Sequence, residues 1–386
     1  MQSLQPKTRF IKSKKAGEGE NMDKTFSTIA PAAATFLALG AQAALAQAPA
    51  ADLYAGKTLT VLVGLAPGGS ADTLVRAFVP HFRRHIPGQP NVVVQNMPGA
   101  GGVLAFNYVY EKAAPDGMTM IYSLWDPLAQ ALGGQGLRAR YDQYEYLGGI
   151  SDIRVNYMRV DAVPGGMKKP ADIMKAKDIA IGAYATTDVA GILAHLSLKT
   201  LGVPHKVVTG YRGGADVFLA LQRGEVHVHN TSLATFRTRS KAFITSGEGV
   251  GLSYLTASDS KGAFTKSKDI DDMPSFQDLY KEVHGKLPSG PDWDALNWTV
   301  QQFGELAYVG LAPPKTPAPA LAVLRKAFAD TMEDKAYIEE STKRNGLPFE
   351  YVDVKQGQGV FKSLSEVSPQ VLTTLRASIG NMSGAK

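Results

Sequence analysis

Residues 91–117 read NVVVQNMPGAGGVLAFNYVYEKAAPDG, and three patterns follow one another in them. An apolar, β-branched run comes first, a glycine-rich turn follows, and an amphipathic pattern then ends at Pro115, Asp116 and Gly117. The run at 92–94 has the composition of a strand that is buried on both faces, as in parallel sheets. The stretch therefore predicts a strand–loop–helix unit of an α/β protein.

The same three patterns occur once more, directly upstream. Residues 58–63 (TLTVLV) form another apolar run, residues 64–72 (GLAPGGSAD) another glycine loop, and residues 73–84 another helical pattern. Glycines leave backbone N–H groups uncovered, and the N-terminus of a helix attracts anions. Two successive units place both loops along one sheet edge, where open α/β sheets bind ligands.

Both glycine stretches resemble the signatures of a known family. Residues 67–77 (PGGSADTLVRA) and 96–120 (NMPGAGGVLAFNYVYEKAAPDGMTM) are similar to the patterns PGGxxDxxAR and NxPGAGGxxAxxxxxxAxPDGYTL of the TctC or Bug proteins. These are the exported solute-binding receptors of tripartite tricarboxylate transporters. GYRGG at 210–214, GEV at 224–226 and YVGLAP at 308–313 resemble later family stretches in the same order. The resemblance covers nearly the whole chain after the leader.

The resemblance implies a fold and a function. The fold is α/β and two-lobed, of the type II periplasmic-binding-protein kind, with a mixed, mainly parallel sheet in each lobe that closes on a ligand. The function is capture of a small organic acid and its delivery to the membrane components of a tripartite transporter. We expect lobe 1 to comprise residues 54–148 and 255–386, and lobe 2 residues 149–254. We also expect a monomer.

Composition narrows the function classes. The chain has 386 residues with 44% hydrophobic content, which is enough for two domains with a sizeable core. Its formal charge is +6, and residues 1–46 hold six Lys/Arg and three Asp/Glu, so the remainder carries +3. So small a charge, with no basic patch interleaved with aromatics, argues against nucleic acid as a partner. The absence of cysteine excludes thiol catalysis, cysteine metal sites and disulfides.

The first 46 residues have the pattern of a leader. Residues 1–21 are polar and precede a second methionine, Met22, so translation can start at Met1 or at Met22. From Met22 the chain has a short basic segment, an apolar stretch, and Ala44-Leu45-Ala46 as a small-x-small cleavage site before Gln47. We therefore expect a signal peptide at 22–46 and export to the periplasm.

Later segments continue the alternation of strands and helices. Strand patterns at 179–183 and 206–209 are each followed by helical patterns, at 189–201 and 215–223, which indicates a parallel sheet. Residues 247–257 are expected to return to the first lobe. Residues 258–290 are polar and rich in loop formers.

Loop residues at the strand ends make up the expected ligand site. Backbone N–H groups of Gly68 to Ser70 and of Gly99 to Gly102 are expected to hold one carboxylate. Aromatic and polar residues at later strand ends are expected to face the same cleft. The expected ligand-binding residues are Pro67, Gly68, Gly69, Ser70, Asp72, Gly99, Ala100, Gly101, Gly102, Trp125, Asp126, Tyr184, Thr186, Thr187, Tyr211, Arg212, His227 and Asn230. We expect no catalytic residue, no metal and no cofactor.

Three positions depart from the family and bear on the ligand. The family usually has Asp where this chain has His227, and small residues where it has Trp125 and Asp126. Trp125 can stack on a flat ligand or cover the hinge. Asp126 is turned away from a ligand carboxylate, meets a cationic or hydroxyl group, or only forms a turn. Taking Trp125, Tyr184 and Tyr211 as aromatic walls, we expect a monocarboxylate with an aromatic or otherwise bulky body ahead of citrate.

Patterns for other kinds of site are incomplete. A dinucleotide fingerprint requires glycine where the chain has Leu104. A G-x-S-x-G nucleophile elbow around Ser70 fails at Asp72. Two histidine pairs have metal-ligand spacing but lack further ligands in sequence, His81 with His85 and His227 with His229. The rival class is an exported α/β hydrolase or isomerase acting on a small organic acid, since catalytic sets need not be visible in sequence.

Overall fold

Strand pairing divides the described part of the chain into two β-sheets. The computed structural model describes residues 53–133, 136–256, 267, 270–345 and 348–383. Residues 47–386 form one compact unit, which contains both sheets. The leader, with the predicted signal peptide and cleavage site, lies outside the described residues.

The first sheet has six strands in the order β11-β4-β10-β3-β1-β2. β1 lies between β2 and β3 and is parallel to both, whereas β10 is antiparallel to β3 and β4, and β11 to β4. Strand bounds are β1 Thr58–Val63, β2 Asn91–Asn96, β3 Thr119–Leu124, β4 Glu145–Ile150, β10 Tyr308–Ala312 and β11 Tyr351–Val352. The predicted strand at 58–63 is confirmed.

The second sheet has five strands in the order β7-β6-β8-β5-β9. β6 is parallel to β7 and β8, and β5 is antiparallel to β8 and β9. Strand bounds are β5 Arg154–Arg159, β6 Ile179–Gly182, β7 His205–Val208, β8 Val228–Ser232 and β9 Gly249–Leu255. The expected α/β class with two mixed sheets is confirmed, with parallel strands around β1 and β6 and antiparallel strands added to them.

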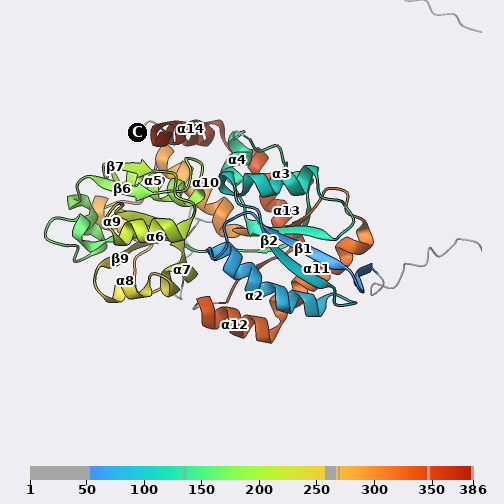
Figure 1. The fold of residues 1–386 in the computed structure, drawn as a ribbon. Helices are drawn as coiled ribbons and strands as arrows, with labels where there is room; N and C mark the ends of the chain where they lie inside the picture. The colour runs from blue at the N-terminus through green and yellow to red at the C-terminus, as the bar shows by residue number, and fades with distance from the viewer. Residues whose placement is uncertain (1–52, 134–135, 257–266, 268–269, 346–347, 384–386) are drawn as a thin grey trace, which may run out of the picture. The chain divides into compact units, whose positions relative to one another are not determined.

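Helices flank both sheets, and Figure 1 shows them around the two sets of strands. We call each sheet with its flanking helices one half of the molecule. The helices of the first half, around the six-stranded sheet, are α2 Ser70–His85, α3 Val103–Glu111, α4 Pro127–Leu132, α11 Ala318–Glu333, α12 Lys335–Asn345 and α13 Val354–Ser363. Those of the second are α5 Val189–Leu201, α6 Gly214–Gln222, α7 Leu233–Thr238, α8 Lys241–Thr245 and α9 Phe276–His284. None of the helices in the described ranges is long and apolar enough to cross a membrane.

The chain crosses between the two sheets twice. Residues 151–153 lead from β4 to β5, and α10 (Pro291–Glu305) leads back from the second sheet to β10. α10 packs against α5 and against the last helix, α14 (Pro369–Ser383), which also contacts α5 and β7. Figure 1 accordingly shows α10 and α14 beside the helices of the second sheet, although both follow residue 255.

Two local expectations are wrong, and one segment has a helix that the sequence analysis did not name. β2 is the outermost strand, so its side chains alternate between exposed and half-buried, and Val93 is 43% exposed. Residues 249–255 stay in the second sheet, because β9 pairs with β5. The polar segment at 258–290 contains the helix α9, which begins where the Ser275 hydroxyl accepts the Asp278 N–H and buries Phe276 and Leu279.

Candidate ligand-binding cleft

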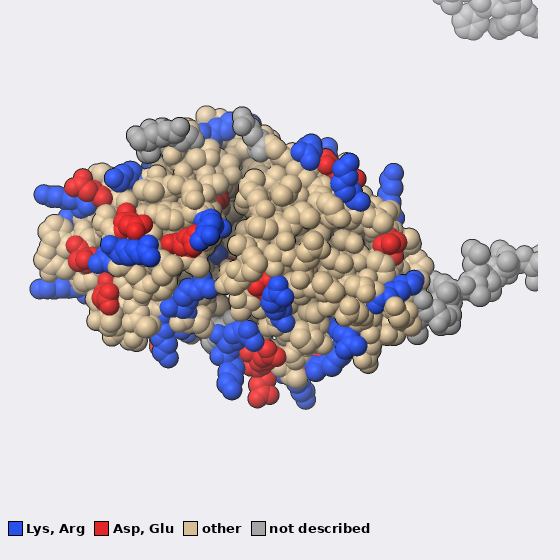
Figure 2. Space-filling model, in the orientation of Figure 1, with Lys and Arg blue, Asp and Glu red and all other residues tan. Residues whose placement is uncertain are grey.

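A cleft lies between the carboxyl end of β1 and the second sheet. Its volume of about 330 Å³ is within the range of small-molecule sites. From the first half it is lined by Leu65, Ala66, Pro67, Gly69, Ser70 and Leu124, and from the crossing helix α10 by Phe303. From the second half it is lined by Arg154, Tyr184, Asp188, Ala190, residues 212–216, Thr231, Thr235 and Arg239. Figure 2 shows a groove on this face, with basic and acidic side chains along its rim.

The first glycine loop is fastened to the cleft by Asp72. The Gly68 N–H donates to Asp72 Oδ2 at 2.9 Å, and Arg76 donates to Asp72 Oδ1 at 2.8 Å. Arg76 also bonds Asn96, whose amide donates to the Leu65 carbonyl at 2.9 Å. Burial alone raises the pKa of Asp72, but the bonds from Arg76 and Gly68 outweigh it and hold this pKa below its ordinary value. Asp72 therefore shapes the loop, and its oxygens are already engaged.

The N-terminus of α2 opens onto this cleft. Gly69 is the N-cap residue and Ser70 the first helical residue, and both line the cleft. The first N–H groups of a helix have no acceptor within it, so those of Ser70 and Ala71 are available to an anion. The positive end of the helix dipole adds to this attraction.

Arg154 supplies a buried cation on the opposite wall. Arg154 is 6% exposed, and its guanidinium lies 5.3 Å from the centre of the Phe303 ring. Nε donates to Asn230 Oδ1 at 2.9 Å, Nη1 to Asp152 at 3.3 Å, and Nη2 to the Asn230 carbonyl at 3.4 Å. These contacts use three of the five N–H donors of an arginine, which leaves two for a ligand. A carboxylate is the group that such a fork binds best.

Acidic side chains balance part of this charge. Asp188 lines the cleft and caps α5, accepting N–H groups of Tyr184, Ala190 and Gly191 at 3.0 to 3.1 Å. Burial raises the pKa of Asp188 to about 6, and burial likewise raises the pKa of Asp152 to about 6. The cleft is therefore less negative at mildly acidic pH than at neutral pH.

Two further arginines stand at the cleft. Arg212 pairs with Asp216 at 2.7 Å and is largely exposed. Arg239, directly after α7, donates to the Gly68 carbonyl at 3.2 Å and so joins the second half of the molecule to the first glycine loop. This contact spans the cleft.

The structure brings together part of the expected site. Pro67, Gly69, Ser70, Tyr184 and Arg212 line the cleft. Gly68, Asp72 and Asn230 do not line it: the exposed Gly68 donates to the buried Asp72 and so shapes the glycine loop, and the buried Asn230 holds Arg154.

The second glycine loop lies elsewhere. Gly99, Ala100 and Gly101 are exposed after the edge strand β2, and the Gly102 N–H donates to the Gly99 carbonyl at 2.9 Å. Gly102 instead packs behind the first loop, since a Cβ on Gly64 would lie 3.0 Å from the Gly102 Cα. None of these residues lines the cleft.

Trp125 and Asp126 differ from the expectation of a cleft wall. Trp125 is 2% exposed, packs on Tyr141 and Phe361, and donates its indole N–H to the Leu306 carbonyl. Asp126 caps α4 by accepting the Ala129 N–H at 2.9 Å, and burial raises its pKa to about 7. Packing therefore draws Trp125 into the core and leaves Asp126 the role of a helix cap.

Four other expected residues do not line the cleft. Thr186, Thr187 and Tyr211 are half-buried in neighbouring loops. His227 directly precedes β8, whereas Thr231, which lines the cleft, is near the other end of that strand. The Nδ1 atom of His227 accepts the Ala180 N–H at 3.0 Å. Of the three expected aromatic walls only Tyr184 remains, joined by Phe303.

Sequence reasoning did not find Arg154, Asp188, Thr231, Thr235, Arg239 or Phe303. Asp188 had a usable signal, since an Asp before an apolar helical pattern is an N-cap. Arg154 had a weaker one, an arginine opening an apolar strand just after the segment that crosses between lobes. Phe303 and Arg239 reach the cleft only through tertiary packing.

The geometry gives the rival classes no support. Ser70 Oγ lies 3.5 Å from the Tyr308 hydroxyl, and no histidine within the described ranges hydrogen bonds to it. His81 and His85 pair with Glu340 and Asp334 at 2.9 and 3.0 Å. No group of three or more metal-ligating side chains that could hold an ion occurs in the part of the chain that the structure describes.

No protein-family model matches the chain. Among curated proteins, the "UPF0065 protein in gbd 5'region" of Cupriavidus necator is 38% identical over 109 residues, which cover 25% of this chain and 32% of that protein. Protein BugT of Bordetella pertussis is 39% identical over 83 residues, which cover 22% of this chain and 24% of BugT. The matches thus span a third or less of these relatives.

Solved structures extend the likeness along the chain. The periplasmic binding protein BugD has a TM-score of 0.60 with 18% identity, covering 85% of this chain and 99% of BugD. The chain resembles the Bug and TctC proteins and shares their fold. MatC of Rhodopseudomonas palustris with bound malate has a TM-score of 0.60 with 19% identity, covering 84% and 99% of the two chains. Rpa4515 of R. palustris with adipate has a TM-score of 0.62 with 18% identity, covering 84% and 97%.

Proposed function

We propose that this chain is a solute-binding receptor that holds a small organic carboxylate in the cleft between its two sheets. The observation that carries the proposal is the pairing of Arg154 with the N-terminus of α2 on opposite walls. A carboxylate between them gains two charge-assisted contacts, one with a guanidinium and one with helix N–H groups. The malate and adipate in two proteins of the same fold support this ligand class.

Closure is part of this function. Binding proteins of two lobes trap a ligand by moving one lobe against the other. Arg239 donates to the Gly68 carbonyl across the cleft at 3.2 Å. This hydrogen bond joins the two lobes beside the cleft and can stabilise a closed form. We take the first sheet with its flanking helices as one lobe and the second sheet as the other, with α9, α10 and α14 packed on the second; the expected bounds at 148/149 and 254/255 then move to the ends of β4 and β9, at Ile150 and Leu255.

Export and delivery complete the proposal. The signal pattern at 22–46 and the resemblance to periplasmic binding proteins support a receptor that works outside the inner membrane and hands its ligand to a tripartite tricarboxylate transporter. N-terminal sequencing of the exported protein should begin at or near Gln47. A full-length cytoplasmic product would contradict export.

A melting-temperature screen of purified protein tests the binding function. Di- and tricarboxylates, aromatic acids and amino acids are added in turn, and a true ligand raises the melting temperature by mass action without being consumed. Conversion of the ligand, followed by chromatography, would instead favour an enzyme. If no organic acid changes the melting temperature, the proposed ligand class is wrong.

A further inference from the structure

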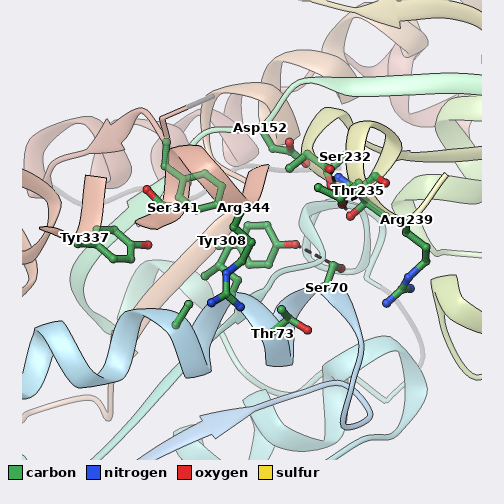
Figure 3. Close-up of a pocket in the computed structure, with 15 residues that line it drawn as sticks. Ser70, Thr73, Asp152, Ser232, Thr235, Arg239, Tyr308, Tyr337, Ser341 and Arg344 are labelled. Carbon is green, nitrogen blue, oxygen red and sulfur yellow. Dashed lines mark hydrogen bonds between the residues drawn. The ribbon is translucent and has the colours of Figure 1, made fainter. Parts of the chain in front are cut away.

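A second, smaller cavity adjoins the cleft, and we name it the side pocket. It has a volume of about 100 Å³ and lies among α2, α7 and α12 and the ends of nearby strands. Ser70, Thr235 and Arg239 line both the side pocket and the cleft, so the two cavities meet at these residues. Figure 3 shows Tyr308, Tyr337 and Arg344 on the side away from Arg239.

The side pocket contains a buried hydroxyl without a partner. Tyr337 on α12 is 2% exposed, its ring packs on Phe78, and its hydroxyl has no hydrogen-bond partner among the described residues. Figure 3 shows this hydroxyl pointing toward Tyr308 and Arg344. Burial raises the pKa of Tyr337 far above neutral pH, so the hydroxyl stays protonated and can donate. Because buried polar groups are nearly always paired, a group that enters the pocket is its natural acceptor.

Charge favours an anion as that group. Arg239 and Arg344 both line the side pocket, and Arg344 also pairs with Glu340 at 2.8 Å. The pocket's carboxylate, Asp152, is paired with Arg154 at 3.3 Å. Hydroxyls and guanidinium groups therefore prevail on a lining whose acid is already neutralised. A carboxylate meets donors here and no unpaired acid.

We propose that the side pocket takes the distal carboxylate of an elongated dicarboxylate whose first carboxylate lies in the cleft. This rests on the proposed function, since the first carboxylate is the one held by Arg154 and α2. Ser70 lies at the junction of the two cavities, so the carbon chain passes it. Tyr337 and Arg344 then determine ligand length: short diacids stop in the cleft, and longer ones gain contacts with α12.

Calorimetry with a series of acids tests the proposal. The ligands are succinate, glutarate, adipate, pimelate and the monoacid hexanoate, and the variants are Tyr337→Phe and Arg344→Gln. We expect Tyr337→Phe to weaken the best-bound long diacid about tenfold and to leave hexanoate unchanged. Arg344→Gln should act in the same direction on the same ligand.

Tyr122→Phe is the matched control. Tyr122 on β3 is fully buried, and its hydroxyl also lacks a partner among the described residues, but it lines neither cavity. Both substitutions delete an unpaired buried hydroxyl, so neither should impair folding. A diacid affinity that is the same in wild type, Tyr337→Phe and Arg344→Gln would overturn the side-pocket proposal while leaving the receptor intact. Failure of wild type to bind any of these acids, while the melting-temperature screen finds another organic acid that binds, would overturn the side-pocket proposal and leave the receptor proposal standing.

Discussion

The two glycine loops have similar sequences and different surroundings. Both follow a β-strand and precede a helix, yet the loop at 64–69 lines the cleft, whereas residues 98–101 of the second loop are exposed and only Gly102 is buried. The difference follows from the positions of their strands, because β1 lies inside the first sheet and β2 at its edge. A loop motif therefore indicates a possible anion site, and the position of its strand decides whether a second wall faces it.

Loss of the cation that faces the first glycine loop across the cleft is expected to have the largest effect on ligand affinity. Arg154→Met deletes the buried guanidinium that faces the first loop. Charge-assisted hydrogen bonds are worth about 1.5–3 kcal/mol, so carboxylate affinity should fall about a hundredfold. Calorimetry measures it, with circular dichroism to confirm folding because Asp152 loses its partner. Arg138→Met, on an exposed ion pair with Glu111 that does not line the cleft, is the control and should leave affinity unchanged. Equal affinities in wild type and Arg154→Met would show that the cleft cation does not meet the ligand.

A side chain added to each glycine loop should show directly which of the two loops contacts the ligand. Gly69→Val places methyl groups at the mouth of α2, where the backbone φ of −74° suits a side chain although its Cβ would lie 3.3 Å from the Ala66 carbonyl oxygen, and we expect affinity to fall about tenfold. Gly101→Val sits at a φ of 68°, so it should lower the free energy of unfolding by roughly 1–2 kcal/mol and leave affinity unchanged. Calorimetry and urea titration give both quantities. If Gly101→Val lowers affinity and Gly69→Val leaves it unchanged, the ligand contacts the second loop and not the first.

Weaker hydrogen bonds within the first glycine loop should lower ligand affinity less than the substitutions above. Asp72→Asn weakens the bonds to Gly68 and Arg76 that shape it. Since Arg76 is half exposed, we expect a loss of only about 1 kcal/mol in the free energy of unfolding and a few-fold loss of affinity. The control is Asp116→Asn in the second unit, where the carboxylate accepts the Met118 N–H at 2.8 Å far from the cleft. If Asp72→Asn and Asp116→Asn lower affinity equally, the bonds that Asp72 makes in the first loop have no specific effect on the cleft.

The smallest predicted effect is a pH dependence of ligand affinity, which is expected only for a ligand bound at the first loop. Asp188 faces it with a pKa raised to about 6 by burial, so near pH 8 the group is charged and repels a ligand carboxylate. Arg154 offsets part of that repulsion. A bound carboxylate favours neutral Asp188, so affinity should rise a few-fold as pH falls from about 8 to about 6, with proton uptake. Calorimetry in buffers of different ionisation enthalpy detects the proton. Binding that strengthens as pH rises would contradict this sign.

Local signals explain what the sequence could predict. The strand at 58–63 and the helix at 189–201 match the structure residue for residue, because an apolar run ends at glycine in one and an Asp cap and a Gly end bound the other. The first loop could also be predicted, since glycines and a helix start mark it. Trp125 could not be placed, because its direction depends on Tyr141 and Phe361 from other segments. Arg154 was missed for the same reason, as Asn230 and Phe303 make it part of the cleft.

A crystal structure with the acid that most raises the melting temperature would show directly which groups hold the ligand. We expect one ligand carboxylate within hydrogen-bond distance of both the Arg154 guanidinium and the Ser70 backbone N–H. A carboxylate held instead by residues 99–102, with Arg154 and Ser70 free of ligand, would contradict it.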